Sequence, residues 1–235
     1  RAFDDIASGL RGSNRGRTRH SLQEAATAAL IDVETAMFRG DGLTGVTWGL
    51  SEVNRSTGGL QRGEMTVLGA RPSMGKTAVG LSVAIKAAKK GHGVAFMSLE
   101  MGAKSLAMRA MTDIAFDWNV RVPYSDLITG KVEPKALEAI RAANQDLDAM
   151  PLWIEEQSGM SISDIAVKLE RIKDVAERSG HTIDLLVVDY LQLVAPSSRY
   201  QGNRTAEITE ISAGLRNLCR EAGVSLLALS QLSRQ

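Results

Sequence analysis

The sequence predicts an α/β fold with a doubly wound, mostly parallel sheet and helices on both faces. From residue 65 onward, apolar segments of strand length alternate with segments of helical periodicity. The strand segments are short, continuous and rich in Val, Leu and Ile, which is typical of parallel strands covered on both faces. Because ligands of such sheets bind beyond the carboxyl ends of the strands, we expect the functional site there.

The expected strands and helices follow one another in a regular order. We expect strands over residues 65–70, 93–100, 151–156, 183–189 and 224–230. We expect a helix starting at 76, helical segments up to 149, and helices over 163–178 and 206–222. The last two helices each carry one apolar stripe at helical spacing: Ile165, Leu169, Ile172 and Ala176 in one, Ile208, Ile211, Leu215 and Leu218 in the other.

A separate N-terminal region precedes this alternation, so we divide the chain into residues 1–38 and 39–235. Residues 9–20 combine glycine, serine and four arginines without apolar periodicity, which favours a solvated linker over a nucleic-acid contact. Ser21 and Glu24 then have capping-box spacing at the start of a helix over 21–38. We expect this helix to pack on its own domain or on a neighbour through a stripe of Leu22, Ala26, Ala29, Val33 and Met37.

Composition excludes several classes of protein. The 235 residues carry a formal net charge of +1, unlike a monomer that coats nucleic acid by charge alone. One cysteine excludes an internal disulfide framework, and three scattered histidines offer no metal-binding spacing. Because no apolar run reaches the roughly 18 residues of a membrane span and no signal peptide is seen, we expect a cytoplasmic protein without membrane association. A start at Arg1 without methionine is expected of a processed or truncated chain.

The segment that joins the first strand to the next helix has the pattern of a phosphate-binding loop. Residues 70–77 form A-x-x-x-x-G-K-T between an expected strand and an expected helix, the context that this motif requires. Small residues let consecutive backbone N–H groups turn toward a phosphate, and the helix N-terminus adds a favourable dipole. We expect Lys76 to reach the β- and γ-phosphates and the Thr77 hydroxyl to ligate Mg²⁺.

We therefore predict that the chain binds ATP, or another nucleoside triphosphate, together with Mg²⁺. The strict motif has glycine where this chain has Ala70, and alanine suffices if φ there is negative. The alternative is a strand-to-helix turn with a chance Gly-Lys-Thr. The residues predicted to form the nucleotide site are Ala70, Arg71, Pro72, Ser73, Met74, Gly75, Lys76, Thr77 and Ala78.

Three polar side chains lie at the ends of later strands. Asp189 ends the strand over 183–189, and we predict that it holds Mg²⁺ beside the phosphate loop rather than being a solvated cap. Glu100 is the candidate catalytic base, with the alternative that it is a partner for a helix N-terminus. Gln231 follows the last strand, and its amide can donate to a phosphate oxygen and accept from water.

The strings GARPSMGKT, FMSLEM, VVDYLQLV and LALSQLSR, in this order, resemble the C-terminal ATPase domain of DnaB-type replicative helicases. The resemblance covers about residues 35–235, including TGVTWGLSEVNRSTGGLQRGE ahead of the phosphate loop. Two of these strings are unusual rather than generic nucleotide-binding patterns, so the resemblance is more specific than the loop alone. It implies a RecA-like P-loop NTPase fold over residues 39–235 and a linker helix within residues 1–38 that docks on an adjacent subunit.

The resemblance also implies an activity and a set of roles. It implies a homo-hexameric ring that hydrolyses ATP between subunits, moves along single-stranded DNA and unwinds duplex at a replication fork. Catalytic roles fall on Lys76, Glu100 and Gln231, the last as a γ-phosphate sensor linked to the DNA side, and the magnesium roles fall on Thr77 and Asp189.

The stretch APSSRYQGNRTAEI resembles a loop of the family that faces the DNA channel. Candidates for phosphate contacts there are Arg199, Asn203 and Arg204, and the alternative is a polar surface loop. Six copies of a short basic loop can line one channel, which is consistent with the modest net charge of one chain.

The sequence departs from the family pattern at both ends. The family's N-terminal, primase-interacting domain is absent, and so is the region after QLSRQ, where the family has its arginine finger and a second DNA-binding loop. We therefore expect a truncated domain, with any primase or helicase-loader contacts made through regions outside this chain. Two alternatives stay open. One is a RecA-like recombination or regulatory ATPase, which would share the phosphate loop and Asp189 but not necessarily DYLQL or SQL, and the other is a nucleotide-gated DNA-binding or loading protein without unwinding.

Overall fold

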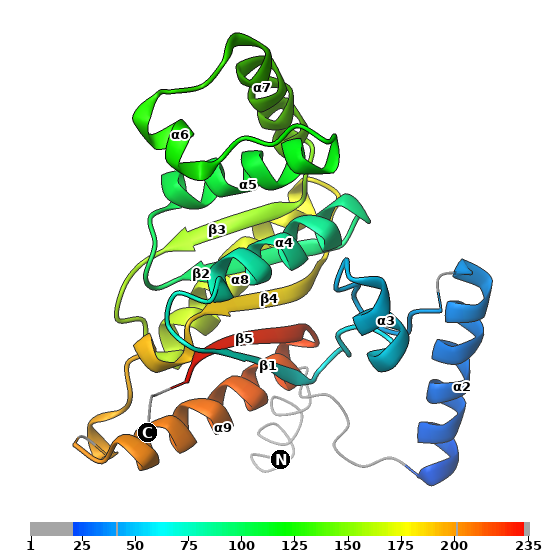
Figure 1. The fold of residues 1–235 in the computed structure, drawn as a ribbon. Helices are drawn as coiled ribbons and strands as arrows, with labels where there is room; N and C mark the ends of the chain where they lie inside the picture. The colour runs from blue at the N-terminus through cyan, green and yellow to red at the C-terminus, as the bar shows by residue number, and fades with distance from the viewer. Residues whose placement is uncertain (1–20, 41, 201, 233–235) are drawn as a thin grey trace. The chain divides into compact units, whose positions relative to one another are not determined.

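The computed structural model describes residues 21–40, 42–200 and 202–232, which form parts of two compact units, Arg1–Thr44 and Gly45–Gln235 (Figure 1). The first unit contains helix α2 (Leu22–Arg39). The Ser21 hydroxyl accepts from the Glu24 backbone N–H, and the Glu24 carboxylate accepts from the Ser21 N–H, so the predicted capping box is confirmed. Of the predicted stripe, Leu22, Val33 and Met37 are exposed.

The second unit is built on a five-stranded sheet whose pairings are all parallel in the described residues. Its strand order is β1-β5-β4-β2-β3, so the last strand in sequence lies between the first and the fourth. Each strand lies within two residues of its predicted span, and the predicted fold class is confirmed. The strands are β1 (Met65–Ala70), β2 (Gly93–Ser98), β3 (Leu152–Glu156), β4 (Ile183–Asp189) and β5 (Ser225–Gln231).

Helices connect these strands in the expected alternation, and none of those described has the length and apolar character needed to cross a membrane. Helices α3 and α6 were not predicted, because both are short and bury no residue. The helices are α3 (Ser51–Thr57), α4 (Lys76–Lys89), α5 (Ala103–Asp117), α6 (Tyr124–Thr129), α7 (Pro134–Asp148), α8 (Ile162–Arg178) and α9 (Arg204–Ala222), with short 3₁₀ turns η1 (Leu191–Leu193) and η2 (Ser198–Tyr200).

Helices cover both faces of the sheet (Figure 1). Because successive strand residues point to opposite faces, Phe96 packs with α4 and α5, whereas Met97 packs with α8 and α9. Each large apolar side chain buried in this way contributes about 1.5–3 kcal/mol to folding. The expectation of strands buried on both faces holds for β2, β4 and most of β5, whereas β1 forms an edge of the described sheet and leaves Val67 50% exposed.

Candidate functional site

The predicted catalytic residues come together at the carboxyl edge of the sheet. β1 pairs with β5 so that Ala70 lies opposite Gln231. β4 lies on the other side of β5 and ends at Asp189, which pairs with Ser98 of β2. Glu100 lies two residues after the end of β2. Side chains from distant parts of the chain are therefore neighbours because parallel strands end at the same edge.

A cavity of about 600 Å³ opens at this edge, a volume within the range of small-molecule sites. Its walls come from the loop after β1, the start of α4, residues following β2 and β4, the last residue of β5, and Arg109 of α5. Two of the predicted residues are not among those lining it: Met74 is largely exposed, and Asp189 is buried behind Lys76. The predicted residues that line it are Ala70, Arg71, Pro72, Ser73, Gly75, Lys76, Thr77, Ala78, Glu100 and Gln231.

The loop after β1 has the backbone geometry of an anion cradle. Gly75 has φ 84° and is the N-cap of α4, a left-handed conformation that favours glycine. In the residues that the structure covers, no side chain caps this helix N-terminus and its first turn has no acidic residue. Its N–H groups can therefore bind a phosphate. Among described non-glycine residues only Ser73 and Asn119 have positive φ, so the condition placed on Ala70 is met.

Lys76 and Asp189 form an ion pair beneath the cavity. The Lys76 Nζ lies 2.9 Å from Asp189 Oδ1, and the two side chains are only 9% and 0% exposed. The same Nζ lies 3.4 Å from the ring centroid of Tyr190, which adds a cation–π contact. Burial raises the pKa of the Tyr190 phenol, and the charges of Glu100 and Asp189 raise it further, so this phenol is neutral at pH 7.

The donor set fits a magnesium nucleotide. Apart from the ion contact with Lys76, the buried Asp189 carboxylate accepts no hydrogen bond from the described residues, which leaves its oxygens able to bind a cation or its water. Elsewhere in the described ranges, no three His, Cys, Asp or Glu side chains gather as a metal cage. Mg²⁺ usually keeps several waters and takes one or two carboxylates plus substrate phosphates, which this site can supply with Thr77.

Glu100 is exposed at the cavity and makes no hydrogen bond or ion pair within the described part of the chain. The alternative considered for Glu100, pairing with a helix N-terminus, is a role that Glu156 fills for helix α5. The Ala103 N–H at the start of α5 donates to Glu156 Oε2 at 2.8 Å, and Glu156 ends β3. The Glu100 carboxylate is therefore available for proton transfer, and its role as the base stays a prediction.

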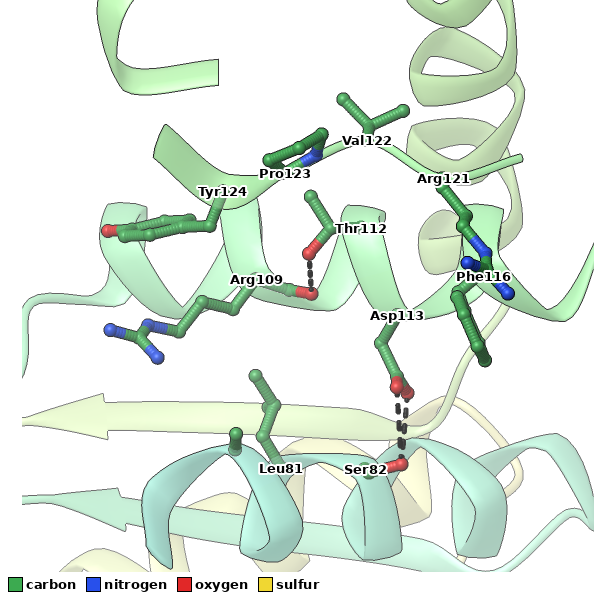
Figure 2. A pocket seen from close by; sticks show the side chains of 11 residues that line it. Leu81, Ser82, Arg109, Thr112, Asp113, Phe116, Arg121, Val122, Pro123 and Tyr124 are labelled. Carbon is green, nitrogen blue, oxygen red and sulfur yellow. Dashed lines mark hydrogen bonds between the residues drawn. The ribbon is translucent and has the colours of Figure 1, made fainter. Parts of the chain in front are cut away.

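Arg109 is a cavity residue that the sequence motifs did not indicate. It lies on α5 and lines both the 600 Å³ cavity and a second cavity, of about 450 Å³, between α4, α5 and residues 121–124 (Figure 2). Its Cζ lies 4.5 Å from the ring centroid of Tyr124, and its buried Nε donates to no described residue. The sequence feature that could have indicated Arg109 is its position as the one basic residue in SLAMRAMTDIAF, a stretch made mostly of small and apolar residues.

We expect Arg109→Gln to weaken binding of an ATP analogue about 10- to 100-fold, because a hydrogen bond to a charged group contributes about 1.5–3 kcal/mol. The measurement is a fluorescence titration with a labelled, non-hydrolysable analogue. Arg121→Gln is the matched control, since Arg121 lines only the second cavity and stacks on Phe116 at 5.8 Å. Equal losses in the two variants would contradict a direct contact of Arg109 with nucleotide.

The three candidate DNA-binding residues have different surroundings. Arg199 is exposed, with its Cζ 5.3 Å from the Tyr200 ring centroid. Asn203 is the N-cap of α9 and accepts from the Ala206 N–H at 3.2 Å. Arg204 donates to the Gln192 carbonyl at 2.8 Å and to Glu207 at 3.2 Å, while more than half of its side chain remains exposed. Contacts of these residues with DNA phosphates stay a prediction.

The parallel sheet, the phosphate loop and the polar strand ends define a P-loop nucleotide-binding domain of the RecA-like class. Residues 45–235 match the family "DnaB-like helicase C terminal domain". The chain belongs to this family, as the sequence motifs predicted.

Named relatives and solved structures agree with this assignment. The chain is 37% identical over 215 residues to the replicative DNA helicase DnaB of Geobacillus stearothermophilus, covering 91% of the chain and 45% of the relative. It is 38% identical over 220 residues to the DnaB helicase of Rhodothermus marinus, covering 91% of the chain and 22% of the relative. The chain thus spans about half or less of the length of these relatives.

Two solved structures have the same fold. The ATPase domain of G40P matches with a TM-score of 0.79 and 30% identity, covering 92% of this chain and 73% of that one. A DnaB-like replicative helicase, whose structure is described with its interactions with primase, matches with a TM-score of 0.76 and 28% identity over 100% of this chain and 53% of that one.

Proposed function

We propose that the chain is the ATPase motor domain of a replicative DNA helicase, which moves along single-stranded DNA and unwinds the duplex at a replication fork. The observation that carries the proposal is the meeting of the phosphate loop, Glu100 and Gln231 around one cavity, with Asp189 behind it, in a chain of the DnaB-like family. This arrangement can bind a nucleoside triphosphate and place an acid and an amide beside its phosphates.

We assign the residues of the cavity to separate tasks. The loop N–H groups and Lys76 bind the phosphates, and the Thr77 hydroxyl and Asp189 hold Mg²⁺, which neutralises developing phosphate charge when bound. Glu100 accepts the proton of the attacking water, while the Gln231 amide contacts the phosphate that leaves. Because Lys76 pairs with Asp189, nucleotide binding requires the ammonium to exchange a carboxylate partner for phosphate oxygens, and Asp189 would then be free to hold Mg²⁺.

We further propose that the chain works as a homo-hexamer on single-stranded DNA, with primase and loader contacts made by other regions of the whole protein. Support comes from the family and from the exposed apolar residues of α2, such as Leu22, Met37 and Phe38, which are suited to packing on a second subunit. The loop with Arg199 supplies an exposed cation that can meet a DNA phosphate.

The test of this function is unwinding of a forked DNA duplex by the full-length protein with ATP and Mg²⁺. We expect strand separation that requires ATP and fails when ATP is replaced by a non-hydrolysable analogue. Nucleotide-dependent DNA binding without strand separation would instead favour a loading protein. Hydrolysis that is independent of DNA and produces no unwinding would favour a regulatory ATPase.

A further inference from the structure

Gln192, in the turn η1 after β4, holds the backbone of Gln231. Its Nε2 donates to the Gln231 carbonyl at 2.9 Å, and its Oε1 accepts from the Gln231 N–H at 3.1 Å. The same Nε2 donates to the Ser230 hydroxyl at 2.9 Å. The Gln192 side chain therefore satisfies both the N–H and the carbonyl of Gln231. The side chain of Gln231 itself lines the nucleotide cavity.

The position of this clamp follows from the register of the sheet. The ladder between β4 and β5 runs from the pair Leu185–Ser225 to the pair Val188–Ala228, and β5 continues to Gln231. Backbone groups at a sheet edge need partners, so the Gln192 amide takes the place that a neighbouring strand would occupy. On its other side, β5 pairs with β1 at Ala70. The position of Gln231 in the cavity thus depends on both the phosphate loop and η1.

The backbone of Gln192 is bonded in turn to the loop that contains the DNA-contact candidates. Its carbonyl accepts from Arg204 Nη2 at 2.8 Å, and Arg204 Nη1 donates to Glu207 Oε2 at 3.2 Å. The other oxygen of Glu207, which is only 9% exposed, accepts from the Gly202 N–H in the loop at 3.0 Å. Hydrogen bonds therefore run without a break from Gln231 through Gln192 and Arg204 to the loop.

We propose that Gln192 and Arg204 are positioning residues that couple the nucleotide cavity to this loop. The proposal rests on the proposed function for the identity of the ligand at the loop, a single-stranded DNA phosphate. The Arg204 side chain is 55% exposed, so a phosphate can reach its guanidinium and compete with the Gln192 carbonyl and Glu207. When Arg204 binds the phosphate instead, the Gln192 carbonyl loses its hydrogen bond from Arg204. The Gln192 side chain, and with it the backbone of Gln231, can then shift.

Arg204 has two alternative partners in this proposal, the Gln192 carbonyl and a DNA phosphate. Binding of DNA and binding of nucleotide each shift the balance between these two states. By linkage, DNA must change the affinity for nucleotide by the same factor by which nucleotide changes the affinity for DNA. Arg204 is then an exchangeable link rather than a fixed DNA contact. Arg199 makes no hydrogen bond to the path that runs from Gln231 through Gln192 to Arg204. In this proposal it contacts a DNA phosphate without affecting the nucleotide cavity.

The experiment measures the affinity of the full protein for a non-hydrolysable ATP analogue with and without saturating oligothymidine. For the wild type we expect a coupling factor in the usual range, about 5- to 150-fold. Gln192→Ala should bring the factor close to one, whatever its effect on the affinity measured without DNA. Arg204→Gln should lower the factor similarly, and Arg204→Lys, which keeps one donor group, should restore part of it.

Arg199→Gln is the matched control. It should weaken DNA binding and reduce the salt dependence by about one unit of slope, with the coupling factor retained at saturating DNA. A thermal melt checks that each variant is folded. If Gln192→Ala unfolds, Gln192→Glu replaces it, because glutamate can still accept from the Gln231 N–H but cannot donate to its carbonyl.

The inference is overturned if folded Gln192→Ala or Gln192→Glu keeps the wild-type factor, whether or not its affinity without DNA changes. It is also overturned if Arg204→Gln behaves like Arg199→Gln, losing DNA affinity alone. Failure of the proposed function looks different: the wild-type protein itself would bind no oligothymidine or no nucleotide, and that result would remove the basis of the coupling as well.

Discussion

Replacement of Lys76 by alanine is expected to lower ATP turnover by about 10²- to 10³-fold, the usual loss when one preorganised donor to a reacting oxyanion is removed. Lys76 follows the glycine at the N-terminus of α4, and its ammonium lies at the base of the cavity. The measurement is steady-state phosphate release with Mg²⁺, together with a titration of ATP-analogue binding. Normal turnover in this variant would exclude the assignment of the phosphate loop.

The same variant has a second expected effect, on stability. Removing Lys76 leaves the fully buried Asp189 carboxylate without its cationic partner, which should lower the free energy of unfolding by about 3–5 kcal/mol. The double variant Lys76→Ala/Asp189→Asn removes the uncompensated charge, so it should regain most of the stability without regaining turnover. Recovery of turnover together with stability would mean that Lys76 acts only in folding.

Replacement of Glu100 by glutamine should leave nucleotide binding intact and lower turnover by about 10²- to 10⁴-fold, the usual contribution of a positioned general base. Glutamine has the size of glutamate but cannot accept the proton of the attacking water. Because Glu100 is exposed and makes no bond to the described residues, its loss should not alter the thermal melt. Loss of nucleotide affinity would instead assign Glu100 to binding.

Glu156→Gln is the matched control for this experiment. Glu156 ends the adjacent strand β3, but its carboxylate accepts from the Ala103 N–H at the start of α5. Its replacement weakens a helix cap, so we expect a small loss of stability and unchanged turnover. Equal losses of turnover in the two variants would show that the effect comes from displacement of α5 and not from proton transfer.

Sequence reasoning predicted the strands and the phosphate loop because both depend on local pattern. A buried parallel strand is a short apolar run, and a phosphate loop is a string with a fixed context, so neither needs knowledge of the strand order. The shared edge of Glu100, Asp189 and Gln231 was also predictable, because parallel strands of a doubly wound sheet end at one edge.

The remaining features of the site depend on tertiary contacts between residues far apart in the sequence. Gln192 is an ordinary polar residue until β5 lies beside η1, and the register that creates its role cannot be read from either segment alone. Arg109 is similar, since only the packing of α5 beside α4 brings it to the cavity. Glu156 takes the helix-capping role offered to Glu100 because β3 pairs with β2.

The place of β5 in the sheet also determines when the domain can fold during synthesis. β5 is synthesised after the other four described strands, yet it joins β1 to β4, and the Ser225 hydroxyl donates to the Leu60 carbonyl across 165 positions of sequence. Until β5 emerges, β1 has no partner strand in the described sheet, and contacts of such long range form slowly. The nascent chain therefore carries its phosphate loop on an unpaired strand until β5 emerges, and an unpaired strand is open to aggregation during that interval.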